Sequence, residues 1–169
     1  MNAITNAEVA LRLVSAIGLG AAIGLEREWY RQRAGIRTMI LISVGSAGFV
    51  LLALETFALM PNNTGQAEIS RVLQGLIGGI GFLGAGTIIQ NRGTIYGLTT
   101  AAAVWCVAAV GAASGLGLFS ISAMLAGATL FTLVALRYVE TKYFPVSPNG
   151  VKRYGPDPES DEPPNQGIT

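Results

Sequence analysis

Long apolar runs separated by short clusters of charged residues make up most of the chain. Each run is about as long as a helix needs to cross a hydrocarbon core of roughly 30 Å. Backbone groups in lipid must be hydrogen-bonded within the segment, and the alternating segments of a barrel are absent from the sequence. The pattern predicts an all-α protein, a polytopic transmembrane bundle of about five helices. Its runs are Val9 to Leu25, Thr38 to Met60, Val72 to Ile89, Gly97 to Ala113 and Leu116 to Leu136.

The number of spans depends on one short connection. Only a few small residues, Ser114 to Gly117, separate the fourth run from the fifth. This spacing leaves open a bundle of four helices with one re-entrant segment.

The distribution of basic residues predicts the orientation in the membrane, because Lys and Arg concentrate in short cytoplasmic loops. With five spans, this places the N-terminus outside and the C-terminus in the cytoplasm of a bacterium, in its inner membrane. The residues expected inside are Arg27, Arg31, Arg33, Arg37, Arg92, Arg137, Lys142, Lys152 and Arg153, and those expected outside are Arg12 and Arg71.

The last part of the chain differs in composition from the rest. Six of the seven prolines fall in residues 145–169, together with four acidic residues. Such a segment cannot bury enough apolar surface to fold. We expect a transmembrane domain over residues 1–144 and a disordered, Pro-rich, acidic cytoplasmic tail over residues 145–169.

Composition argues against catalysis. Charged residues make up 12% of the chain, against about 25% in soluble domains. There is no histidine, and the single cysteine, Cys106, lies inside an apolar run. Neither a nucleotide-binding loop nor a catalytic triad nor a metal-ligand cluster is found, so we expect no enzyme, no cofactor and no nucleic-acid partner. Binding of Mg²⁺ stays open, with Glu26 and Glu55 as weak candidate ligands.

Two charged residues inside the apolar runs predict ion pairs, since charges in a membrane usually face the bundle interior and pair there. Arg12 and Glu26 share a face of the first helix, and Arg37 and Glu55 share a face of the second. Because the two helices are antiparallel, we expect a charge clamp of two pairs, Arg12 with Glu55 and Glu26 with Arg37. The alternative is that Arg12 extends to the headgroups and Glu26 is solvated.

Glycine is concentrated in the third run. Small residues four apart let helices approach closely in lipid, so one interpretation is a tightly packed central helix. The other is a broken helix that lines a cavity with free carbonyls. In the first run, Gly20 and Gly24 predict a second surface for close packing. The glycines of the third run are Gly75, Gly78, Gly79, Gly81, Gly84 and Gly86.

Several stretches in order resemble the MgtC/SapB family of bacterial membrane proteins. The family motif residues here are Glu26, Arg27, Glu28, Arg37, Thr38 and Arg71. The matching stretches are GLGAAIGLERE, GIRT, SRVLQGLIGGIGFLGAGTII and GLTTAAAVWCVAAVGAASGLGL. The chain departs from the family pattern at Met39, where a histidine is usual, and it has a short tail in place of a cytoplasmic domain.

The resemblance implies a protein of magnesium homeostasis, associated with adaptation to low magnesium and with virulence. Our leading hypothesis is regulation of other membrane proteins through the glycine-rich helix faces. A magnesium-importing P-type ATPase and the F-type ATP synthase are the partners that the resemblance implies, beside the lipid bilayer and further copies in a homo-oligomer. The alternatives are a transporter or channel for Mg²⁺ or another cation, and a purely structural oligomer.

Overall fold

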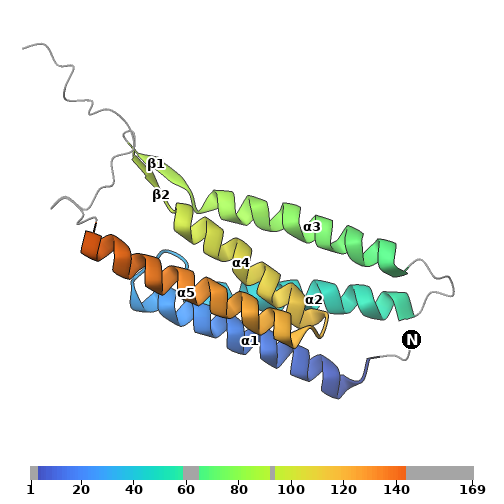
Figure 1. The fold of residues 1–169 in the computed structure, drawn as a ribbon. Helices are drawn as coiled ribbons and strands as arrows, with labels where there is room; N and C mark the ends of the chain where they lie inside the picture. Colours follow the sequence, from blue (N-terminus) through green and yellow to red (C-terminus); the bar gives the residue numbers. More distant parts are fainter. Residues whose placement is uncertain (1–3, 59–64, 92–93, 144–169) are drawn as a thin grey trace, which may run out of the picture.

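The computed structural model describes residues 4–58, 65–91 and 94–143, which form a bundle of five helices with one short hairpin (Figure 1). The elements are α1 (Asn6–Trp29), α2 (Ile36–Ala58), α3 (Gly65–Gly86), β1 (Ile89–Asn91), β2 (Thr94–Tyr96), α4 (Leu98–Gly115) and α5 (Phe119–Tyr143).

All five helices are long and apolar enough to cross a membrane. The prediction of a multi-pass all-α bundle with five spans is confirmed, and the alternative with four helices is wrong. The hairpin was not predicted; its strands pair antiparallel with Ile89 opposite Tyr96. The expected tail over residues 145–169, like Met60 and Arg92, lies outside the described residues.

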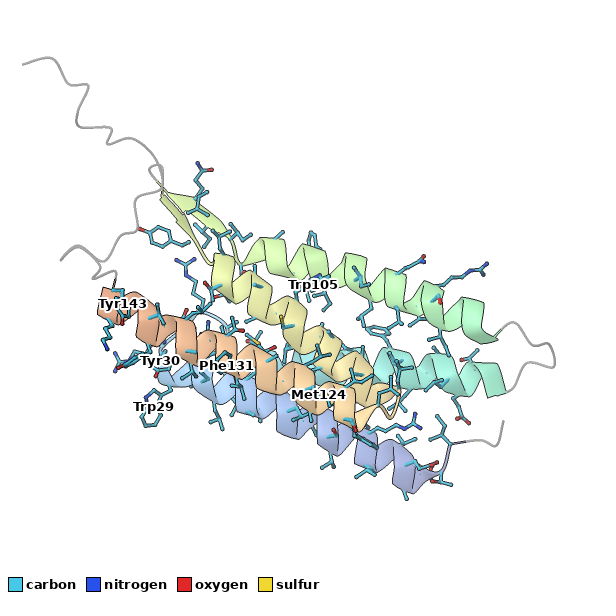
Figure 2. All side chains as sticks on the ribbon, viewed as in Figure 1. Trp29, Tyr30, Trp105, Met124, Phe131 and Tyr143 are labelled. Carbon is cyan, nitrogen blue, oxygen red and sulfur yellow. The ribbon has the colours of Figure 1, made fainter. Side chains whose placement is uncertain are left out.

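The bundle has two distinct ends. One carries the α1–α2 loop, the β1–β2 hairpin and the C-terminal end of α5, and we call it the hairpin end (Figure 1). Trp29, Tyr30 and Tyr143 gather there (Figure 2), as aromatic residues do at membrane interfaces. The opposite end carries the start of α1 and the α4–α5 turn. Which side of the membrane the hairpin end faces stays a prediction. The basic residues at the hairpin end are Arg27, Arg31, Arg33, Arg37, Arg137 and Lys142.

The central helix is α4. It packs against all four other helices, and 61% of its span is buried, against 11% for α3. Because α4 is built largely of Ala, Gly and Val, neighbours can approach it from several sides. The glycine-rich helix α3 lies at the edge, against α2 and α4 (Figure 1), and is continuous. Both interpretations of the third run, a central helix and a broken one, are therefore wrong for the single chain.

Glycines bring the α2 and α4 backbones together. A Cβ atom on Gly111 would overlap the backbone carbonyl of Ser43, and one on Gly115 would lie 2.7 Å from the carbonyl oxygen of Ala47. The side chain of Ser43 is fully buried and donates a hydrogen bond of 2.8 Å to the carbonyl oxygen of Ala16 on α1. α1 also approaches α2 through Gly20, whose Cβ would lie 2.9 Å from that of Ser43.

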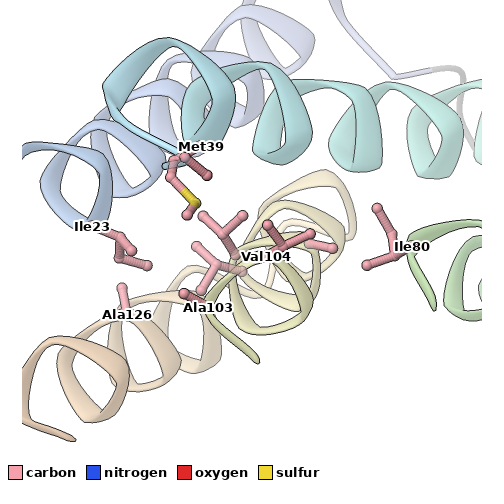
Figure 3. Packing of buried hydrophobic residues seen from close by; sticks show 10 residues of the cluster. Ile23, Met39, Ile80, Ala103, Val104 and Ala126 are labelled. Carbon is pink, nitrogen blue, oxygen red and sulfur yellow. The ribbon is translucent and has the colours of Figure 1, made fainter. Parts of the chain in front are cut away.

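An apolar cluster fills the space between α1, α2, α4 and α5. Met39 is completely buried and points toward Val104, with Ile23 nearby on α1 (Figure 3). Met is flexible and fills irregular gaps between helices. Met39 thus occupies the interior of the bundle, and the position where the family usually has a histidine lies within its apolar packing.

The connection between α4 and α5 is short because α4 ends in a tight cap. Gly117 has a φ of +78°, and its N–H donates to the carbonyl of Ser114 at 2.9 Å. The N–H of Leu118 donates to the carbonyl of Ala113 at 2.9 Å. This is a Schellman motif, in which a glycine in the left-handed region satisfies the last carbonyls of a helix. It explains how two membrane spans are joined by so few residues.

Arg12 lies against this turn. Its Nη1 donates a hydrogen bond of 2.9 Å to the carbonyl oxygen of Gly115, and a Cβ on Gly117 would lie 3.1 Å from its Nη2. The expected pair of Arg12 with Glu55 is wrong, since the guanidinium binds the negative end of the α4 dipole instead. Glu55 is exposed and has no ion pair among the described residues.

We expect Gly111→Ala to destabilise the bundle, because the added methyl group must push the backbone of α2 away from α4. The cost should be about 1–3 kcal/mol, as for other overpacked sites, measured as a lower midpoint of thermal unfolding in mild detergent. Gly45→Ala on α2 is the matched control, since nothing lies within 4 Å of its Cβ position. Equal midpoints for the two variants would refute the close contact.

Arg12→Met should lower the stability by about 1.5–3 kcal/mol, because it removes a charged hydrogen bond and leaves the Gly115 carbonyl unsatisfied. Glu55→Gln should change it by less than about 0.5 kcal/mol, as expected for an exposed residue without a partner. Thermal unfolding of both variants and of the double variant distinguishes this assignment from the clamp. If Glu55→Gln is as harmful as Arg12→Met, and the double variant is no worse, the clamp is correct.

Candidate functional site

The α1–α2 loop builds one side of the hairpin end. The N–H of Gln32 donates to the carbonyl of Arg27 at 2.9 Å, and Arg31 takes the left-handed conformation with a φ of +51°. α1 therefore ends with the same cap geometry as α4, but without glycine. The carboxylate of Glu28 accepts a hydrogen bond of 3.2 Å from the N–H of Ile36, at the start of α2. This bond fixes the direction in which α2 leaves the loop, because it satisfies an otherwise unpaired N–H.

A buried ion pair lies just before this loop. The Nε of Arg27 is 2.6 Å from Oε2 of Glu26, and its Nη2 donates to Oε1 of the same carboxylate at 3.1 Å. The two side chains are only 3% and 7% exposed. Such a two-point pair between guanidinium and carboxylate is the strongest form of charged hydrogen bond.

This pairing corrects the second half of the expected clamp. Glu26 binds the neighbouring Arg27, whereas Arg37 is exposed and has no ion pair among the described residues. The physical reason is that Glu26 turns into the bundle, toward α5, while the start of α2 is held by Glu28. A count of 100° per residue assigns residues to a face but does not say which neighbour that face meets.

α5 adds a second cation next to the pair. Nη1 of Arg137 is 4.0 Å from Oε1 of Glu26, and the Arg137 guanidinium stacks over the ring of Tyr30, with its Cζ 3.7 Å from the ring centroid. Figure 2 shows Tyr30 beside the last turns of α5. The guanidinium is thus held between a carboxylate and an aromatic face, a favourable cation–π arrangement. The carboxylate of Glu26 thus faces two arginines.

A cavity of about 290 Å³ adjoins these charges. It lies between α1, α4 and α5 at the hairpin end. Thr99 stands in the first turn of α4, and the N-cap residue of that helix, Gly97, has no side chain to cap it. The lining residues are Arg27, Gln32, Thr99, Thr132, Leu133, Leu136 and Arg137.

The expected acidic metal site is not assembled. Glu26 lies at the hairpin end in the ion pair, whereas Glu55 lies near the opposite end of α2. Across residues 4–58, 65–91 and 94–143, no group of three or more His, Cys, Asp or Glu side chains could hold a metal ion.

The remaining residues of the family motif divide between the two ends. Thr38 is exposed at the start of α2, close to Arg37 in the chain. Arg71 lies on α3 toward the opposite end of the bundle, so it takes no part in this cavity. Of the motif residues, only Arg27 lines the cavity, with Glu26 bound to it.

Sequence reasoning missed several parts of this site. Arg137 was placed only among the basic residues expected inside, and Thr99 and Thr132 were not singled out. The sequence did contain a signal for Arg27, because it directly follows the oppositely charged Glu26 at the end of a helix that leads into a basic loop. No comparable signal marked the two threonines.

The comparisons with known proteins find relatives over most of the chain. The chain is 38% identical to the protein MgtC of Salmonella typhimurium strain LT2 over 146 residues, which are 85% of this chain and 60% of that protein. It is 41% identical to the protein MgtC of Brucella abortus, over 75% of this chain and 49% of that protein. It is 39% identical to the protein SrpB of Synechococcus elongatus, over 76% of this chain and 72% of SrpB. No solved structure is significantly similar.

The chain thus spans less than two thirds of the length of the MgtC proteins that it resembles. The shared part is the membrane bundle: the model of the MgtC family matches residues 13–142, from the first turns of α1 to the last turn of α5. On this match, and on the identity shared with its relatives, the chain belongs to the MgtC family.

Proposed function

We propose that this membrane protein serves magnesium homeostasis and adaptation to low magnesium in the bacterial inner membrane, by regulating other membrane proteins. The regulating surface is the glycine face of α3, which the described part of the chain leaves uncovered. The single observation that carries this proposal is a contrast within one bundle: some glycines pack against a neighbouring helix, whereas most glycines of α3 have no neighbour at the Cβ position.

Close packing within the chain uses two glycines on α1, Gly20 and Gly24, and two on α4, Gly111 and Gly115. A Cβ on Gly24 would lie 2.6 Å from the Cα of Ile36, and one on Gly111 would overlap α2. Among the α3 glycines from Gly75 to Gly86, only Gly84 has a neighbour, with a Cβ position 3.5 Å from the carbonyl oxygen of Ala101. The others are exposed, with nothing within 4 Å of the Cβ position: Gly75, Gly78, Gly79, Gly81 and Gly86.

Two of these glycines form part of a groove between α2 and α3, with a volume of about 430 Å³. Gly75 and Gly79 are four residues apart, the spacing at which two transmembrane helices approach most closely. The groove is apolar, so its occupant is a transmembrane helix of another membrane protein. The resemblance to the family offers a magnesium-importing P-type ATPase and the F-type ATP synthase as the partners to test first. The other residues that line the groove are Phe49, Val72, Leu76, Ile80 and Leu83.

We expect Gly79→Leu to abolish the interaction, because the leucine side chain fills the groove that receives the partner helix. In a strain that lacks the natural gene, this variant should fail to restore growth at low magnesium. After purification in mild detergent, the amount of ATPase or ATP synthase subunit bound to the tagged variant should fall by about tenfold or more, as expected when a well-packed interface is blocked.

The control for this experiment is Gly127→Leu on α5. Gly127 is also exposed, with nothing within 4 Å of its Cβ position, and it is far from the α2–α3 groove. Gly127→Leu should support growth and retain the partner. Full growth with Gly79→Leu would sink the proposal. So would uptake of Mg²⁺ by proteoliposomes of the purified protein that is lost in Glu26→Gln, since that result would establish a transporter.

A further inference from the structure

The C-terminal end of α3 is fixed to the start of α4, where the β1–β2 hairpin joins the two helices (Figure 1). A Cβ on Gly84 of α3 would lie 3.8 Å from the Cβ of Ala101 on α4. A Cβ on Gly97, just before α4, would overlap the carbonyl of Thr87, just after α3. Gly97 has a φ of +90°, which glycine adopts without strain. Close backbone packing therefore holds this end of α3 in place.

Further from the hairpin, apolar cavities lie on both sides of α3. One is the α2–α3 groove of about 430 Å³. The other, which we call the α3–α4 cavity, has a volume of about 300 Å³ and lies between α3, α4 and the start of α5. Leu76 and Ile80 line both cavities, so the side chains of α3 form the wall between them. A movement of this part of α3 that widens one cavity must narrow the other.

The face of α4 in the α3–α4 cavity allows a closer approach. It is built largely of alanine, including Ala109 and Ala112, and small side chains let helices pack closely in lipid. The antiparallel register that places Gly84 beside Ala101 brings Leu73 level with Ala112, about 17 Å further along the helices. Both Leu73 and Ala112 line the cavity. The helices thus carry the side chains of a closed interface at the place where the structure has a cavity.

The two directions of movement are nearly balanced in energy. Both cavities are lined by apolar side chains or glycine, so water does not fill them. When α3 moves away from α2, it exchanges apolar contacts on one side for apolar contacts on the other, and each such contact contributes little by itself. A helix that binds in the α2–α3 groove can then decide the position of α3, because it interacts with only one of the two.

We propose that α3 pivots about its hairpin end between two positions, and that a helix entering the α2–α3 groove moves the rest of α3 against α4. In the structure, the α3–α4 cavity is open; in the second position, the groove is wider and the cavity is closed. This inference rests on the proposed function, since it describes how binding at the same groove is regulated. Filling the α3–α4 cavity should hold α3 against α2 and keep the groove narrow.

The test compares two engineered disulfides in the full chain with Cys106→Ala, reconstituted into liposomes. Leu73→Cys/Ala112→Cys, the far pair, spans the α3–α4 cavity. Gly84→Cys/Ala101→Cys, the near pair, lies at the fixed end, where the Cβ separation of 3.8 Å suits a disulfide. On addition of an oxidant, the near pair should form rapidly and the far pair slowly. Rapid oxidation of the near pair also shows that a variant is folded.

Gly79→Leu takes the place of the partner helix, because its side chain fills the α2–α3 groove. It should displace α3 rather than α2, since close packing holds α2 against α1 and α4. The far pair should then form about tenfold faster or more, as expected when a position populated at about 10% becomes the main one. Gly127→Leu, at an exposed position of α5, is the control and should leave the rate unchanged.

Trp105 provides a second readout that needs no cysteine. It lines the α3–α4 cavity and is 52% exposed, and Trp29→Phe makes it the only tryptophan of the chain. In liposomes of lipids brominated on their acyl chains, its fluorescence should be quenched less in Gly79→Leu than in the parent, because α3 then covers the cavity. Ala109→Leu fills the cavity from α4, so it should slow the far pair in the parent and cancel the effect of Gly79→Leu.

A far pair that forms no faster in Gly79→Leu than in Gly127→Leu would overturn the pivot. Stronger quenching of Trp105 in Gly79→Leu would do so too, because α3 would then leave α4 as well as α2. An unchanged far pair in Ala109→Leu would also contradict it, even if Gly79→Leu did not fold. No partner is present in these liposomes, so the result is independent of the growth experiment. If Gly79→Leu closes the cavity yet supports growth at low magnesium, the pivot stands and the partner surface is wrong.

Discussion

Ser43 is the point on which the packing of three helices depends. Its backbone carbonyl faces Gly111 of α4, its Cβ faces Gly20 of α1, and its hydroxyl binds the carbonyl of Ala16. In lipid, the hydrophobic effect does not drive helices together, so their association depends on close packing and hydrogen bonds. A larger residue at any of these places would separate helices whose attraction falls steeply with distance. The rest of the bundle is arranged around this junction.

The central place of α4 follows from this constraint. A helix that touches four neighbours must offer small residues on several faces, and α4 does so with alanine, glycine and valine. α3 has glycines too, but it meets only α2 and α4 closely and keeps most of its surface outward. Glycine therefore allows close packing inside the bundle on α4 and leaves an exposed surface on α3.

Hydropathy alone predicted the five spans, since length and apolar character decide whether a segment crosses a membrane. It did not predict that α4, rather than α3, is central, because the number of glycines does not reveal which faces are covered. The charge clamp failed for a related reason: Glu26 found its partner next to it in the chain, and Arg12 found a backbone carbonyl. The cavity at the hairpin end needed three dimensions, as its polar residues come from α1, α4, α5 and the loop after α1.

The turn between α4 and α5 bears on the biogenesis of the protein. Leu116 to Leu118 contain no charged residue that could hold this loop at a membrane surface during insertion. The positive charge at the turn comes from Arg12, more than one hundred residues earlier in the chain. Since α1 leaves the ribosome first, the two last helices can enter the bilayer together as a hairpin and find their anchoring charge already in place. The short form of the turn thus relies on a charge supplied by α1 as well as on glycine.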